Sequence, residues 1–150
     1  MASRDRNEGN VPVECKVGKG MLWICAQEDI TDAFLAMFNE SDQVITCKDG
    51  LVGSVGDACR RRGMPEPLLF NVGFATERKR DLPFLLKQVK VMMDRGQSVI
   101  LHCHAGVHRA AHVLCLLLMF LLGITYAEAR RQLECVRTVE LDGILESRCT

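Results

Sequence analysis

Short apolar runs alternate along the chain with segments whose apolar residues recur at helical spacing. The short runs predict strands at 11–17, 21–26, 43–47, 68–72 and 98–102. The helical pattern predicts helices over 29–38, 55–62, 81–95, 109–122 and 126–137, with a short last helix after Leu141. This order predicts a single-domain α/β fold, in which helices cover both faces of a central, mostly parallel sheet of about five strands. Residues 1–11 are polar and predict a loose N-terminal arm, so the folded domain is expected over 12–150.

Two neighbouring segments stand out by their continuous apolar character. Residues 98–102 are typical of a central parallel strand that is buried on both faces. The run from Val113 to Leu122 contains ten apolar residues without a break. Because a membrane span needs about 20 residues, we expect a buried core helix and no membrane span.

Composition narrows the functional classes. Lys and Arg together number 19, as do Asp and Glu, and this zero net charge argues against general nucleic-acid binding. Most of the eight cysteines lie within apolar runs, no C-x-x-C pair occurs, and the polar N-terminus lacks an apolar signal segment. We therefore expect thiols rather than a disulfide framework or a zinc ribbon. We also expect an intracellular, cytoplasmic location, with the nucleus as the alternative.

Residues 102–109, His-Cys-His-Ala-Gly-Val-His-Arg, join the predicted central strand to the predicted buried helix. The N-terminus of a helix offers unpaired N–H groups and partial positive charge, which bind anions. Gly106 lets successive N–H groups converge on one centre, and Arg109 offers a planar fork for two phosphate oxygens. The same positive field favours the thiolate form of Cys103, which would face a bound phosphate as a nucleophile.

The string H-C-x-x-G-x-x-R resembles the signature of protein tyrosine phosphatases, and the order of elements over 12–148 resembles the compact dual-specificity type. The resemblance implies that Cys103 forms a phosphocysteine and that Arg109 binds phosphate. It also implies that the loop amides hold the phosphate oxygens, those of His104, Ala105, Gly106, Val107, His108 and Arg109. His102 is expected to support this loop by hydrogen bonding. The resemblance implies no metal and no organic cofactor.

The chain departs from that family at two positions. Ala110 stands where family members usually carry Ser or Thr, whose hydroxyl stabilises the departing thiolate. The stretch 71–75 holds no carboxylate, although the family places a general-acid aspartate on that loop. Glu77 is a candidate general acid if the loop folds back, with a solvated charge as the alternative, while Asp81 is expected to cap the following helix. Loss of a general acid typically costs about 10²–10⁴-fold in rate.

All four histidines fall between His102 and His112. Zinc binding is an alternative, because His108 and His112 are four residues apart on one helix face. Arg109 lies amid these ligands, and no cysteine or carboxylate follows at metal spacing, so we favour His104 and His108 at the rim of the phosphate loop.

Three functions remain open. The first is a phosphatase of phosphoproteins, acting on phosphotyrosine and, as a further candidate, on phosphoserine and phosphothreonine. The second is a pseudophosphatase that keeps the phosphate loop and binds phosphorylated partners. The third is a phosphatase of a phosphoinositide or an RNA 5′-phosphate. Intact Cys103 and Arg109 favour an enzyme, whereas Ala110 and the missing acid favour the binder.

Overall fold

The computed structural model describes residues 12–70, 75–104 and 109–136, without the side chains of 75–81 and 134–136. The predicted N-terminal arm, the predicted helix after Leu141 and loop residues 105–108 lie outside these ranges. The strands are β1 (Val13–Val17), β2 (Gly20–Ala26), β3 (Gln43–Thr46), β4 (Leu68–Leu69) and β5 (Ser98–Cys103). The helices are the 3-10 turn η1 (Gln27–Asp29), α2 (Asp32–Leu35), α3 (Gly53–Arg62), α4 (Ala75–Asp94), α5 (Arg109–Leu122) and α6 (Tyr126–Val136).

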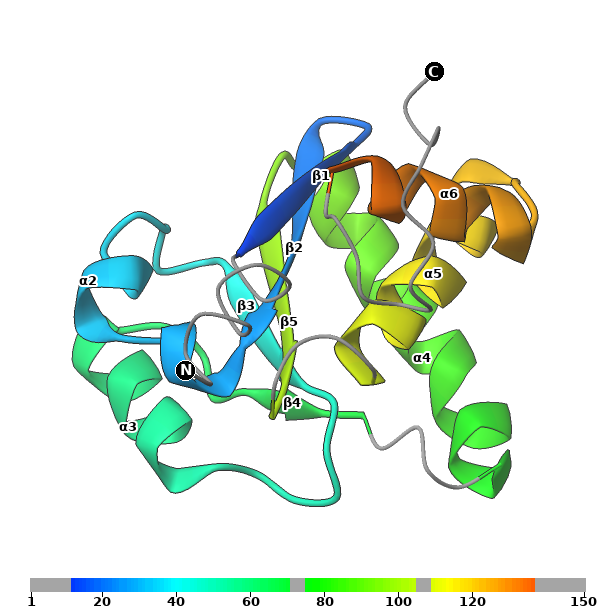
Figure 1. Cartoon of the computed structure of the whole chain (residues 1–150). Helices are drawn as coiled ribbons and strands as arrows, with labels where there is room; N and C mark the ends of the chain where they lie inside the picture. Colours follow the sequence, from blue (N-terminus) through cyan, green and yellow to red (C-terminus); the bar gives the residue numbers. More distant parts are fainter. Residues whose placement is uncertain (1–11, 71–74, 105–108, 137–150) are drawn as a thin grey trace, which may run out of the picture.

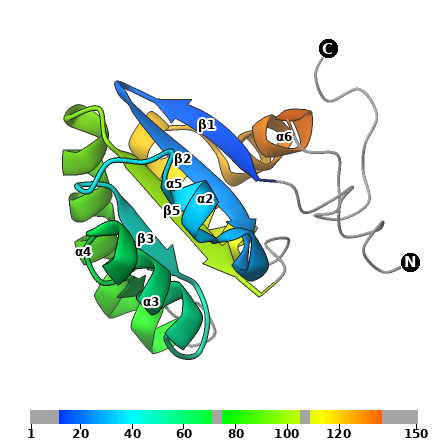
Figure 2. The ribbon, with the colours of Figure 1, turned by 90° about the vertical axis from the view of Figure 1, so that its left-hand side faces the viewer.

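The five strands form one sheet in the order β1-β2-β5-β3-β4. In the described sheet only the pairing of β1 with β2 is antiparallel, while β2, β5, β3 and β4 run parallel to one another. Figure 2 shows β5 between β2 and β3. The predicted mostly parallel α/β sheet is confirmed, and its central strand is the apolar segment that leads into the phosphate-loop sequence.

Helices cover both faces of the sheet, as predicted. In Figure 1, α4, α5 and α6 lie on one side of the strands and α2 and α3 on the other. Each side has its own apolar core: Val99 and Leu101 of β5 belong to the larger one, and Ile100 belongs to the smaller. The alternation of these residues explains why β5 carries an unbroken apolar run, since both of its faces are covered.

The long apolar run folds into α5, whose residues from Ala110 to Leu118 are mostly buried. The apolar character of α5 up to Leu118 is explained by its packing against the sheet, α4 and α6, while Phe120 and Leu122 in its last turn are exposed. No helix within the described ranges is long and apolar enough to cross a membrane alone. The segments Arg109–Leu122 and Tyr126–Leu133 pass that test only together, as a pair bent by 119°.

Three element boundaries differ from the predictions. Helix α4 begins at Ala75, so Asp81 lies inside it and the expectation that Asp81 caps the helix is wrong. The helix predicted over 29–38 is shorter, because Thr31 caps α2 by accepting a hydrogen bond from the Phe34 N–H at 3.1 Å. Strand β4 has two residues rather than five.

Candidate functional site

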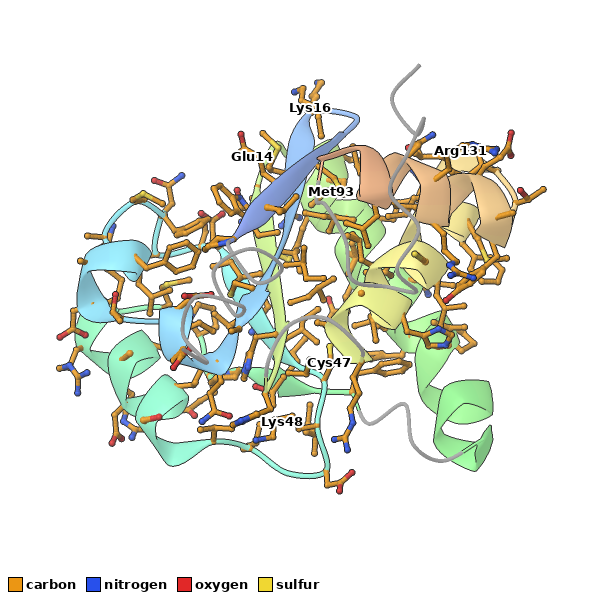
Figure 3. The ribbon with its side chains drawn as sticks, viewed as in Figure 1. Glu14, Lys16, Cys47, Lys48, Met93 and Arg131 are labelled. Carbon is orange, nitrogen blue, oxygen red and sulfur yellow. The ribbon has the colours of Figure 1, made fainter. Side chains whose placement is uncertain are left out.

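Three strands end at the same edge of the sheet and bring their following loops together. The register pairs Ala26 of β2 with Cys103 of β5, and Thr46 of β3 with His102 of β5. In parallel sheets, ligands bind beyond the carboxyl ends of the strands, at the point where the strand order reverses. Figure 3 labels Cys47 and Lys48, which directly follow β3 at this edge. The sheet topology therefore places the segment after β3 beside the start of the phosphate-loop sequence.

Backbone hydrogen bonds hold residues 102–104 at that edge. The Cys47 N–H donates to the His102 carbonyl at 2.8 Å, and the Gln27 N–H donates to the His104 carbonyl at 3.0 Å. These two bonds extend the pairing with β3 and β2 past the ends of both strands. The base of the loop is thus fixed from both sides before the chain turns toward α5.

His102 supports the loop from within the core, as expected for a structural histidine. Its side chain is fully buried, with Nε2 2.8 Å from Thr46 Oγ1 and Nδ1 3.3 Å from the Cys103 carbonyl oxygen. A carbonyl only accepts, so Nδ1 carries the proton and the Thr46 hydroxyl donates to Nε2. Burial lowers the pKa of His102 to about 4, which keeps the ring neutral at physiological pH.

Cys103 lies directly beneath the first turn of α5. Its Sγ accepts a hydrogen bond from the Ala110 N–H at 3.4 Å, and the residue is 4 % exposed. An N–H group of the first helical turn has no partner within the helix and belongs to its positive end. This arrangement stabilises negative charge on the sulfur, which a nucleophilic thiolate requires.

A second thiol lies near Cys103 but has a different environment. Burial raises the pKa of the Cys47 thiol well above its ordinary value, and the charge of Cys103 raises it further. The Cys47 Sγ donates toward the Ile45 carbonyl oxygen at 3.9 Å. Cys47 therefore remains a protonated thiol in the core and makes a poor nucleophile. The six described cysteines include no disulfide.

A pocket of about 560 Å³ opens next to Cys103. Its described lining comes from three places: the end of β5, the start of α5 and the segment that follows β3. The lining residues are Lys48, Asp49, Gly50, Leu51, Val52, Cys103, His104 and Arg109. The pocket has room for a phosphate group together with part of the molecule that carries it.

Charged groups at this pocket are arranged for an anion. Arg109 is half-exposed, and its Nη1 lies 3.7 Å from Asp49 Oδ1. Lys48 adds a second cation, whose Nζ donates to Gln27 Oε1 at 2.9 Å. Two cations against one carboxylate leave a positive balance among the described charged side chains. A phosphate would compete with Asp49 for the Arg109 guanidinium.

The sequence-predicted residues divide into three groups. Cys103, His104 and Arg109 line one pocket, and His102 lies buried behind them. Ala105, Gly106, Val107 and His108 lie outside the described residues, so their predicted contacts with phosphate remain predictions. Glu77 falls in the first turn of α4, and its side chain is also outside what the structure describes.

The histidines that bear on the zinc alternative are engaged elsewhere where the structure describes them. His112 Nδ1 lies 2.8 Å from the Tyr126 hydroxyl, and the His102 ring lies against Thr46 and the Cys103 carbonyl. Within the described ranges, no group of three or more His, Cys, Asp or Glu side chains is placed to hold a metal ion.

Sequence reasoning missed the wall of the pocket formed by Lys48–Val52. Residues 48–52 carry no predicted role, although the wall contributes one cation, one carboxylate and two apolar side chains. The place of Lys48 in the chain could have indicated this wall. Lys48 follows a strand that is parallel to the central strand and next to it, so its loop lies at the same edge of the sheet.

Known proteins match this chain by structure but not by sequence. No family model matches the chain, and no curated protein matches it by sequence. Many solved structures match its fold, among them the Cydia pomonella PTP-2 phosphatase, with a TM-score of 0.65, 20% identity, and coverage of 81% of this chain and 78% of that chain. Human DUSP28 matches with a TM-score of 0.64 and 15% identity, over 93% of this chain and 90% of that one.

A third structural match is named as a phosphatase-like interacting protein. The human tyrosine phosphatase-like serine/threonine/tyrosine-interacting protein has a TM-score of 0.55 and 14% identity, over 77% of this chain and 78% of that chain. The three proteins share the α/β fold with this chain at low sequence identity. The chain therefore has the compact dual-specificity phosphatase fold that its sequence predicts.

Proposed function

We propose that the protein is a cysteine-dependent phosphatase that hydrolyses phosphate monoesters on proteins through a phosphocysteine intermediate. The observation that carries this proposal is the Ala110 N–H bonded to Cys103 Sγ, at the base of a pocket that Arg109 also lines. The sulfur, the helix N-terminus and the guanidinium meet at one place, as nucleophilic attack on a bound phosphate requires.

The reaction proceeds in two steps. The Cys103 thiolate attacks phosphorus, the bond from phosphorus to the leaving oxygen breaks, and that oxygen takes up a proton. Water then attacks the phosphocysteine, the P–S bond breaks, and inorganic phosphate leaves with the thiolate restored. Arg109 and the N–H groups at the start of α5 stabilise the charge that spreads over the phosphoryl oxygens.

Two features support phosphotyrosine over phosphoserine as the substrate. Leu51 and Val52 line the wall, and Leu51 is 58 % exposed, so it offers apolar surface to an aromatic ring. A phenolate is also a better leaving group than an alkoxide, so it depends less on a proton donor. We propose phosphotyrosine as the principal substrate and phosphoserine and phosphothreonine as weaker ones. A nucleophile that must remain a thiol rather than a disulfide suits an intracellular, reducing compartment.

The second candidate is a pseudophosphatase that binds phosphorylated partners without turning them over. Two observations favour it. Ala110 offers no hydroxyl to the departing thiolate, and the Asp49 carboxylate lies 3.7 Å from Arg109 Nη1, where it competes with a phosphate for the guanidinium. The name of the third structural match, an interacting protein, is compatible with such a use of the fold.

Turnover of para-nitrophenyl phosphate by wild type, Cys103→Ser and Glu77→Gln separates these functions. A phosphatase predicts wild-type turnover that Cys103→Ser abolishes. An unchanged rate of Glu77→Gln on phenyl phosphate, whose leaving group depends on a proton donor, would clear Glu77 of the acid role. Absence of wild-type turnover combined with tight binding of vanadate would establish the binder. Comparing phosphotyrosine peptides with phosphoinositide and 5′-phosphorylated RNA tests the substrate class. Preference for either of the latter two would overturn the protein-phosphatase proposal.

A further inference from the structure

The carboxylate of Asp49 lies where a proton donor is needed. The stretch 71–75 holds no carboxylate, and Glu77 belongs to the separate helix α4. Among the described residues that line the pocket, Asp49 is the one carboxylate, and Cys103, His104 and Arg109 line the same pocket. The leaving oxygen of a phosphate bound at Cys103 points away from the sulfur, because attack and departure are in line. It therefore faces the open side of the pocket, where the segment after β3 forms the wall.

Arg109 links the position of Asp49 to the phosphate. Asp49 Oδ1 lies 3.7 Å from Arg109 Nη1, and its side chain is 77 % exposed. The guanidinium that would grip the phosphate thus already neighbours the carboxylate. A phosphate seated between Cys103 and Arg109 would lie close to Asp49 without any movement of the sheet.

Substrate binding changes which protonation state of Asp49 is favoured. The Asp49 carboxylate lies beside the cation of Arg109. A phosphate dianion takes over the guanidinium and adds negative charge beside Asp49, and both changes favour the neutral acid. The other titratable or charged groups on the lining are Lys48, whose Nζ donates to Gln27 Oε1, and His104 and Cys103. Lys48 opposes protonation, while the Cys103 thiolate supports it.

We propose that Asp49, from the loop after β3, is the catalytic residue that protonates the leaving oxygen. This inference rests on the proposed phosphatase function and adds its proton donor. Asp49 gains a proton from solvent as the substrate binds, and gives it to the leaving oxygen as the P–O bond breaks. In the second step the Asp49 carboxylate accepts a proton from the attacking water and releases it to solvent as phosphate leaves, which returns the site to its starting state. Atoms and charges balance without a metal or a co-reactant.

The rival role for Asp49 is a simple competitor for Arg109. A competitor would weaken phosphate binding equally for every substrate, so its removal would raise affinity regardless of the leaving group. A proton donor acts only on the departing oxygen, so its removal hurts poor leaving groups most. The dependence of rate on the leaving group therefore separates the two roles.

The test compares kcat/KM of wild type and Asp49→Asn on para-nitrophenyl phosphate and on phenyl phosphate, whose phenol is the poorer leaving group. We expect a loss of about 10²-fold or more on phenyl phosphate, a much smaller loss on para-nitrophenyl phosphate, and disappearance of the high-pH fall in wild-type kcat. Asp49→Glu, which keeps an acid, should recover part of the phenyl phosphate activity. Asp94→Asn is the matched control, because Asp94 ends α4 and pairs with Lys90 Nζ at 3.2 Å.

Each other outcome overturns the inference in a recognisable way. An equal gain on both substrates would make Asp49 a competitor for Arg109, and an equal loss would make it a positioning residue; either result overturns the donor role and leaves the phosphatase function standing. If wild type turns over neither substrate faster than Cys103→Ser, the proposed function itself fails and the role of Asp49 fails with it. If Asp49→Asn does not fold, Asp49→Glu is used instead, because its longer side chain displaces the carboxyl group. Full activity of Asp49→Glu with the same leaving-group dependence as wild type would then count against Asp49 as the proton donor.

Discussion

The Ala110 N–H donates to the Sγ of Cys103 across 3.4 Å, joining the first turn of α5 to the last residue of β5. This contact joins a strand that is buried on both faces to a buried helix. Burial fixes both elements, so the positive end of the helix is held over the sulfur at little cost in conformational entropy at the moment of reaction.

Thiol reactivity should single out Cys103. We expect iodoacetamide to alkylate Cys103 before Cys15, because burial raises the pKa of the Cys15 thiol to about 11. Inorganic phosphate should slow alkylation of Cys103 and leave Cys15 unaffected. Peptide mapping by mass spectrometry after short exposures measures both rates. Faster labelling of Cys15, or no protection by phosphate, would contradict the assignment of the anion site.

Ala110→Ser should speed hydrolysis of the phosphocysteine. The backbone N–H of residue 110 already reaches Cys103 Sγ, so a hydroxyl on the same residue can add a donor to the departing thiolate. A hydrogen bond to a charged group is worth about 1.5–3 kcal/mol, which corresponds to a rise of about 10- to 100-fold in the rate of phosphocysteine hydrolysis. Stopped-flow measurement should show a product burst in wild type that shrinks in the variant. Ala111→Ser, on the next buried residue of α5, is the control and should bring no gain.

Arg109→Lys should weaken phosphate binding while keeping the charge. Lysine lacks the planar fork that grips two oxygens, and a hydrogen bond to a charged group is worth about 1.5–3 kcal/mol. We therefore expect kcat/KM to fall and the inhibition constant for phosphate to rise, each about 10- to 100-fold. Arg61→Lys serves as the control, since Arg61 pairs with Asp32 on the surface. Equal behaviour of the two variants would remove Arg109 from the site.

His102 should make folding stability fall in mildly acidic solution. Burial lowers its pKa to about 4, so between that value and the ordinary one of about 6.5 the unfolded chain binds a proton that the folded chain excludes. Stability is then present above pH 6.5 and is lost as the pH falls toward 4. The loss amounts to about 2–4 kcal/mol.

Urea unfolding at several pH values measures this effect as the difference between wild type and His102→Gln. The variant should lack the slope between pH 6.5 and 4, whatever its stability at pH 7. His104→Gln, at an exposed position, should keep the wild-type slope. Parallel slopes for wild type and His102→Gln would show that this ring is not the buried neutral base that its contacts indicate.

Local patterns were sufficient for the elements that carry the nucleophile. The apolar run before Cys103 and the run from Val113 to Leu122 predict β5 and α5 almost to the residue, because each is bounded by a glycine or by the loop sequence. The start of α4 was missed because residues 75–80 are mostly polar and hold no apolar stripe. The periodic signal begins only with Leu82, so Asp81 was interpreted as a cap.

The wall of the pocket could not be predicted from local patterns. Lys48–Val52 faces Cys103 only because β5 inserts between β2 and β3, a pairing between segments more than fifty residues apart. Nothing near Asp49 in the sequence indicates that Arg109 is its neighbour. The order of the strands in the sheet decides which loops meet. The periodicity of apolar residues predicts each element but not this order.

The most direct test of this account is trapping of the phosphocysteine. Wild-type protein is mixed with para-nitrophenyl phosphate, quenched in acid within one turnover, digested and analysed by mass spectrometry. We predict one added phosphoryl group on the peptide that contains Cys103, and no adduct in Cys103→Ser. Two results would contradict the assignment of Cys103 as the nucleophile. One is a phosphoryl group on another residue, and the other is a burst of product in the first turnover without a phosphorylated Cys103 peptide.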